Sequence, residues 1–276
     1  FGVGDVVGRL PGALAGVLGA LSLYGLVARL SGVRAALYAS AALITMPAYA
    51  HHAGTMGGEG RLLASFAAAI AGLGLGAVER PRSSRFFAAA LLATLGLLGG
   101  LLCRGLLVGV ACPLGAVGLA VLLTRPQLGA QPSGARARYG VVLVLAAASA
   151  LALYLALALP RVGKGAELLR LVGASLDAPA GREVSFDRVV RQLGHALFPW
   201  SALLPFALAR LGSAPPRGLE PIARHRESFL RTLLLAAAAL GFVVEALLVP
   251  WSGARPFVAA PPATTPGAAR GKKPPP

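Results

Sequence analysis

The sequence predicts an all-α fold, a polytopic bundle of transmembrane helices, from three observations. Hydrophobic residues make up 56% of the chain and charged residues only 13%. The mean hydropathy is +0.72. Many long runs of Ala, Leu, Gly and Val carry no charge, and arginine-bearing loops separate them. One water-soluble core cannot cover this much apolar surface, so the bilayer must be the solvent.

The spans follow from length, because a helix needs about 20 apolar residues to cross the hydrocarbon. We expect about eight spans, some of them short or closely joined. The run from Phe86 to Leu123 is interrupted only at Cys103, Arg104 and Gly105. We interpret this triplet as a tight turn between two helices at the membrane surface. The expected spans are 11–28, 35–50, 62–78, 86–102, 105–124, 139–160, 195–212 and 229–250.

Arginine placement predicts the orientation. The loops after spans one, three, five and seven hold 13 basic residues, whereas the intervening short loops carry only Arg61 and Arg104. The positive-inside rule assigns the first group to the cytoplasm. The segment 51–61, the Arg104 turn and the loop 161–195 then face outward. The cytoplasmic group is Arg29, Arg34, Arg80, Arg82, Arg85, Arg125, Arg136, Arg138, Arg210, Arg217, Arg224, Arg226 and Arg231, against the acids Glu79, Glu220 and Glu227.

The bundle is expected over residues 1–252, with 161–195 as an outward loop within it. Residues 253–276 are rich in Pro, Ala and Gly and predict a disordered tail. Phe1 is not a start methionine and nothing resembles a signal peptide, so we expect an internal piece of a longer protein, incomplete at its N-terminus. The net charge of +16 is dispersed among membrane loops. We therefore expect membrane lipids as partners, and no nucleic acid.

The outer segment 51–61 carries the first candidate site residues. Glu59 could act as a base or a metal ligand at the membrane boundary, with Arg61, His51 or His52 holding an anionic group. The alternative is a wet, glycine-rich turn whose charges avoid lipid. The two histidines are weak evidence for a metal, because adjacent helical residues point in different directions and no third ligand is evident. We assign no metal ligand and keep a divalent ion open as a cofactor.

Arg104 is the second candidate. An arginine in the middle of the membrane costs about 2.5–3.5 kcal/mol, and much less at the interface. At the outer face its five donors suit a lipid phosphate or pyrophosphate. The alternative is an interfacial anchor that reaches ordinary headgroups.

Two further polar groups need an explanation. His195 precedes the aromatic segment that ends in Trp200, and it could transfer a proton or make a structural hydrogen bond. Trp200 is expected to anchor the next span at the interface. Glu245 is the one acid deep in an apolar run, although Pro250 and Trp251 follow closely. Acids within the membrane are functional candidates by default.

Four segments, in order along the chain, resemble motifs of one family. Residues 1–16 resemble G-x-x-E-x-x-x-R-L-P-S-A-L, and residues 46–59 resemble P-x-x-x-x-x-x-R-T-x-x-x-D. Residues 95–105 are similar to G-L-x-x-G-L-A-x-L-x-K-G, and residues 194–205 to L-F-P-W-S-x-x-L-P. The family is bacterial family 39, the dolichyl-phosphate-mannose-protein mannosyltransferase-like glycosyltransferases, which include the aminoarabinose transferases of lipid A.

The resemblance implies a GT-C-like membrane glycosyltransferase of the bacterial inner membrane. Its donor would be a polyprenyl-phosphate-linked sugar, its acceptor a lipid or a protein, and its active site would lie at the outer face. By position, Glu59 matches the family's second functional acid and Arg104 would contact the carrier phosphate. Arg61, His52 and His195 are expected to bind substrate.

The chain departs from the family pattern at several positions. Asp5 replaces a glutamate, Glu59 an aspartate, Arg104 a lysine, and Gly54 an arginine. With Arg9 and Trp200, Asp5 is expected to have a structural or interfacial role. The family's first catalytic acid lies upstream of the R-L-P motif, and this chain does not contain it.

Two other classes of function stay open at this point. A multi-pass transporter would need polar residues inside its spans, and apart from Glu245 there are almost none. A non-catalytic, truncated membrane scaffold would fit the same hydropathy. The sequence favours surface chemistry over translocation.

Overall fold

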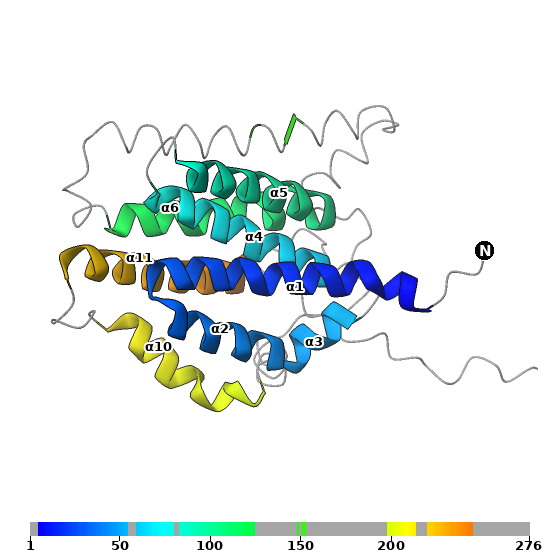
Figure 1. Cartoon of the computed structure of the whole chain (residues 1–276), viewed down its shortest axis with the longest axis horizontal. Coiled ribbons are helices and arrows are strands. Elements are labelled where there is room, and N and C mark those ends of the chain that lie inside the picture. The colour runs from blue at the N-terminus through cyan, green and yellow to red at the C-terminus, as the bar shows by residue number, and fades with distance from the viewer. Residues whose placement is uncertain are drawn as a thin grey trace, which may run out of the picture.

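The computed structural model is helical through the residues that it describes (Figure 1). These are residues 5–54, 59–79, 83–124, 198–213 and 220–244, together with 148, 151 and 152. Three helical segments among them are long and apolar enough to cross a membrane, namely Gly8–Leu30, Gly60–Val78 and Ser84–Thr124. An all-helical fold with candidate membrane spans is therefore confirmed for the part of the chain that the structure describes. The expected count of eight spans is not reached within the described residues.

The first two helices form an antiparallel pair. α1 runs from Asp5 to Leu30 and α2 from Val33 to Thr45. Between them Gly32 has a φ of 99°, a conformation that only glycine adopts without strain. α2 therefore returns alongside α1, which it contacts (Figure 1).

The expected single span over 35–50 is wrong, because the chain breaks at Met46. This residue is extended, with φ −70° and ψ 122°. A residue before a proline is disfavoured in a helix, and Pro47 follows. Pro47 then opens α3 (Pro47–Gly54), since proline is tolerated in a first helical turn. With 13 and 8 residues, neither α2 nor α3 is long enough to cross a bilayer.

α4 (Glu59–Val78) packs against α1, α5 (Ser84–Leu106) and α6 (Cys112–Thr124). Small residues bring the backbones of α4 and α5 close together. A Cβ built on Gly72 would lie 2.7 Å from the carbonyl oxygen of Ala89, and one on Gly96 would lie 2.7 Å from the Cα of Ala69. This is the close helix packing in lipid that the Gly and Ala content favours.

The predicted turn at residues 103–105 is confirmed. Gly105 has φ 74° and ψ −169°, which interrupts the helix, and the π-helical turn η1 (Leu107–Ala111) then leads into α6. In one continuous helix Gly100 and Gly109 would lie about 13–14 Å apart. Instead, a Cβ on Gly100 would lie 2.6 Å from the carbonyl oxygen of Gly109. The segment Ser84–Thr124 is therefore a hairpin of two helical arms.

Three further elements complete the described part of the chain. They are η3 (Trp200–Leu203), α10 (Leu204–Gly212) and α11 (Pro221–Val243). α11 contacts α6 and α1, and α10 contacts α11 (Figure 1). The helix expected over 229–250 thus starts earlier, at Pro221. The loop 161–195 and the tail 253–276 lie outside the described residues, as does most of the expected span 139–160.

Large apolar side chains remain exposed on the helix surfaces. On α1, Leu14, Leu18 and Leu21 are 55%, 62% and 58% exposed. On α5, Leu91 and Leu95 are 61% and 56% exposed. Contiguous apolar surface of this kind is rare on soluble monomers. Its natural solvent is the lipid interior that the hydropathy predicts.

Candidate functional site

The bundle has two ends that carry different polar residues. At one end Leu30, the start of α2 and the end of α4 come together, and there Arg29 pairs with Glu79. We call this the Glu79 end; it lies to the left in Figure 1. The opposite end is formed by α3, the start of α4 and the Gly105 turn, and we call it the Arg104 end.

At the Arg104 end, α3 is packed tightly onto α1 and α4. The Tyr49 hydroxyl donates to the carbonyl oxygen of Gly16 at 2.5 Å. A Cβ on Gly60 would collide with the carbonyl oxygen of His52 and lie 3.3 Å from the Cα of Ala53. The backbone of α3 therefore lies directly against the first turn of α4. This places the His51–His52 pair beside the turn that carries Arg61.

Two arginines, one on α4 and one on α5, lie at this end. Arg61 is exposed on the first turn of α4, and Arg104 is half-buried on the last turn of α5. Both guanidinium groups act electrostatically on the exposed Cys103 thiol, so both lie near it. Two cations that are 43 positions apart in the sequence thus lie at the same end of the bundle, each close enough to Cys103 to act on it. Such an arrangement can hold an anionic group such as a phosphate.

The two histidines lie edge to face, with ring centroids 5.6 Å apart. His51 is exposed and His52 half-buried. Within the described ranges, no group of three or more His, Cys, Asp or Glu side chains could hold a metal ion. The pair can contribute imidazole groups to the Arg104 end, next to Arg61.

Trp200 also belongs to the Arg104 end. Its indole Nε1 donates to Thr45 Oγ1 at 2.9 Å, and Thr45 is the last residue of α2. Phe198, which precedes it, is 62% exposed. The side chains of the aromatic segment therefore lie at the surface, where we expected an interfacial anchor. His195, three residues earlier, is outside the described part of the chain.

For two of the remaining predicted site residues, the structure describes only the backbone. Glu59 is the first residue of α4 and Asp5 the first of α1, and their side chains are not among those described. Arg9 is exposed in the second turn of α1. Glu245 falls just beyond the last described residue. Glu59 thus begins the helix that carries Arg61, two positions before it.

The Glu79 end holds an ion pair that the sequence did not reveal. Arg29 Nε donates to Glu79 Oε1 at 2.5 Å, and the Glu79 side chain is only 9% exposed. The hydrogen bond from Arg29 holds the pKa of Glu79 below its ordinary value, against burial, which raises it. Arg85 and Arg226 also lower this pKa. The partners are 50 positions apart, so no local spacing points to the pair.

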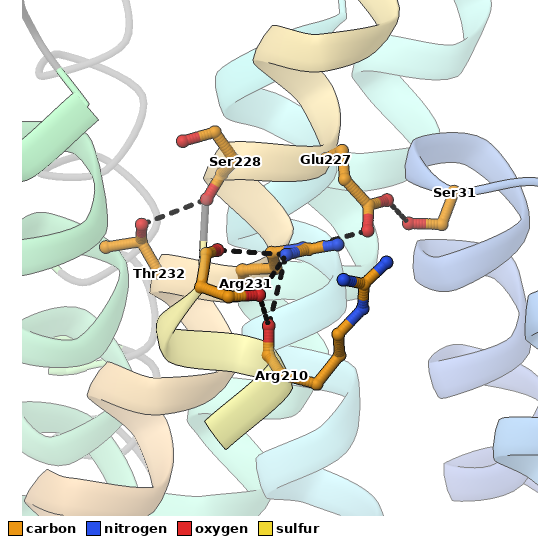
Figure 2. A network of polar contacts seen from close by, with 7 residues as sticks. Ser31, Arg210, Glu227, Ser228, Arg231 and Thr232 are labelled. Carbon is orange, nitrogen blue, oxygen red and sulfur yellow. Dashed lines mark hydrogen bonds and ion pairs between the residues drawn. The ribbon is translucent and has the colours of Figure 1, made fainter. Parts of the chain in front are cut away.

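A second polar network at the Glu79 end centres on Arg231 (Figure 2). Arg231 Nε donates to Glu227 Oε1 at 3.0 Å, four positions earlier on α11. Its Nη1 donates to the carbonyl oxygens of Arg210 and Ser213 at 3.1 and 3.0 Å. Glu227 in turn accepts from the hydroxyl of Ser31. The i, i+4 spacing of Glu227 and Arg231 is visible in the sequence. The hydrogen bonds from Arg231 to the end of α10 are not.

Comparison with known proteins gives one match. A family model described as dolichyl-phosphate-mannose-protein mannosyltransferase matches residues 1–154. The match covers α1 to α6, and so the elements that build most of the Arg104 end. No curated protein and no solved structure matches the chain.

Proposed function

The chain belongs to the dolichyl-phosphate-mannose-protein mannosyltransferase family, and from this premise we propose a specific reaction and place for it. The family implies a glycosyltransferase that uses a polyprenyl-phosphate-linked sugar. We propose that this chain transfers the sugar to a lipid or protein acceptor at the outer face of the bacterial inner membrane. The Arg104 end is the proposed site.

One observation carries the proposal: Arg61 and Arg104 lie at the same end of the bundle, on two helices within the residues that the family model matches. Both are near Cys103. A polyprenyl-phosphate donor keeps its phosphate at the membrane surface and its lipid tail in the hydrocarbon. Cations beside an apolar helix surface suit such a ligand, because the headgroup and the tail need different surroundings.

The proposed chemistry is displacement at the anomeric carbon. A bond forms between that carbon and the acceptor oxygen as its bond to the phosphate oxygen breaks. Polyprenyl phosphate leaves with the electron pair, and Arg104 stabilises its charge, helped by Arg61. Glu59 removes the proton of the acceptor hydroxyl, while His52 and His195 contact substrate. A divalent ion would stabilise the same negative charge on the leaving phosphate. We assign no residues to bind it.

The charge distribution supports the outward orientation of this end. Within the described residues, seven arginines belong to the Glu79 end, whereas three, Arg9, Arg61 and Arg104, belong to the other. The positive-inside rule then favours the Glu79 end as cytoplasmic. The seven are Arg29, Arg34, Arg85, Arg210, Arg224, Arg226 and Arg231.

The proposal is tested with membrane vesicles that contain the full-length protein. The substrates are polyprenyl-phosphate hexoses and pentoses, and the release of polyprenyl phosphate is measured. We expect Arg104→Ala and Glu59→Gln each to lower the rate by about 10²–10³-fold, because each removes a group that acts in the transition state. Arg34→Ala is the matched control, since Arg34 is exposed at the opposite end. Release that persists in both site variants would refute the assignment.

A further inference from the structure

The segment formed by η3 and α10 is not packed into the apolar core. No residue of either element is buried. Its large side chains point outward, with Leu203, Phe206 and Leu208 being 53%, 74% and 43% exposed. A helix with so few buried contacts is not fixed by packing alone. Polar contacts at its two ends therefore add to its packing against α11.

The carboxyl end of α10 is held by one buried side chain. Arg231 is 8% exposed and donates to the carbonyl oxygens of Arg210 and Ser213 (Figure 2). The last carbonyls of a helix have no partner within it, and arginine can satisfy them. Ser213 also donates to the carbonyl of Arg210, through its backbone N–H and its hydroxyl, so Arg231 adds a partner from another helix. Glu227 fixes the guanidinium from the other side, through Oε1 at 3.0 Å. Its link to Ser31 ties this arrangement to the α1–α2 turn.

The amino end of the same segment is held at the opposite end of the bundle. Trp200 opens η3 and donates to Thr45 Oγ1 at 2.9 Å. Residues 200–213 therefore connect the Glu79 end with the Arg104 end, with a polar contact at each extremity. A displacement of α10 at Arg231 must be passed along this short helical segment to Trp200.

We infer that Arg231 is a positioning residue, which sets the place of Trp200 at the Arg104 end by holding the far end of α10. The catalytic consequence rests on the proposed function, because it assumes that the Arg104 end is the site. The guanidinium is required rather than any cation, since its planar fork reaches two carbonyls and a carboxylate together. A lysine ammonium reproduces only part of this arrangement.

The first measurement follows Trp200 itself. The chain has two tryptophans, so Trp251→Phe leaves Trp200 as the only one. In this background, quenching of tryptophan fluorescence by acrylamide reports how exposed Trp200 is. We expect Arg231→Ala to raise the quenching constant about twofold or more, and Arg231→Lys to give an intermediate value. Thr45→Val removes the indole acceptor directly and should match Arg231→Ala.

The second measurement is kinetic, on the full-length protein in membrane vesicles with polyprenyl-phosphate sugars. We expect Arg231→Ala to lower kcat by about 10- to 100-fold, because a displacement of about 1 Å at a site is enough for such a loss. KM should change by less than about threefold, and Arg231→Lys should recover part of kcat. This split separates misplaced groups from lost substrate binding.

Arg29→Ala is the control for general damage, because Arg29 contacts Glu79 and does not touch α10. It should leave Trp200 quenching unchanged. Equal quenching in Arg231→Ala and the parent, or the same increase in Arg29→Ala, would overturn the inference. If Arg231→Ala does not fold, Arg231→Lys decides by the same criterion. Failure of the parent to release polyprenyl phosphate would refute the proposed function alone, since the fluorescence result stands by itself.

Discussion

Arg231, Arg29 and Arg104 carry the same charged group in three different surroundings. Arg231 is 8% exposed, and carbonyl oxygens and a carboxylate surround its guanidinium. The Arg29 side chain is 37% exposed and forms an ion pair with the buried carboxylate of Glu79. Arg104 is half-buried next to an exposed thiol. The burial of Arg231 among its acceptors indicates a structural task. A cation at the edge of an apolar bundle, such as Arg104, is a candidate for ligand binding.

The Arg29–Glu79 pair makes stability depend on pH. The pKa of Glu79 is below its ordinary value of 4.5 in the folded protein. The stabilisation is therefore complete above about pH 4.5 and is lost as the pH falls through the lower, folded pKa. We expect Arg29→Ala to lower the free energy of unfolding by about 1–3 kcal/mol at pH 7. Thermal unfolding in detergent between pH 7 and 3 measures both effects.

The sign of the pH effect provides the internal check. Without Arg29, the hydrogen bond that depresses the Glu79 pKa is gone and burial still raises it. The variant should therefore lose less stability on acidification than the parent protein. Arg34→Ala, at the same end of the bundle but exposed, should behave like the parent. An unchanged acid dependence in Arg29→Ala would contradict this account.

At the scale of elements, hydropathy located the helices better than it located their ends. The expected spans 11–28, 62–78, 86–102 and 105–124 correspond to α1, α4, α5 and α6. Two apolar runs are broken by a helix end, at Gly105 and at Met46-Pro47, and only the first is predicted from the sequence. Gly105 was expected to turn the chain, whereas Met46-Pro47 was included within a span. An apolar average conceals a single proline, although the residue before it cannot easily remain helical.

The contact between α4 and α5 can be tested with two glycines of the same helix. Gly72→Ala should destabilise the protein by about 1–3 kcal/mol, because its Cβ would collide with the backbone of Ala93 and Ala89. A Cβ on Gly76 would meet nothing within 4 Å, so Gly76→Ala should leave stability unchanged or raise it by up to about 1 kcal/mol, because alanine favours the helix. Unfolding in detergent measures both. Equal losses in the two variants would rule out a close contact at Gly72.

For the whole molecule, charge along the sequence predicted which groups share an end. The structure places Arg61 and Arg104 near Cys103, and Arg29 and Glu79 at the opposite end, as the alternating arginine content indicated. The pairings across 50 to 196 positions could not be predicted. Many arginines could pair with few acids, and nothing in one sequence chooses between them. The roles of Glu59, whose side chain is not described, and of His195 remain predictions.

The orientation of the bundle is the claim on which the proposed function depends most. It is tested by single cysteines in a chain whose Cys103 and Cys112 have been replaced, labelled on intact cells with a maleimide that does not cross membranes. Arg61→Cys and Arg104→Cys should be labelled from outside, whereas Arg34→Cys and Arg85→Cys should react only after permeabilisation. Labelling of positions 61 and 104 from opposite sides of the membrane, or of both only from inside, would contradict the account.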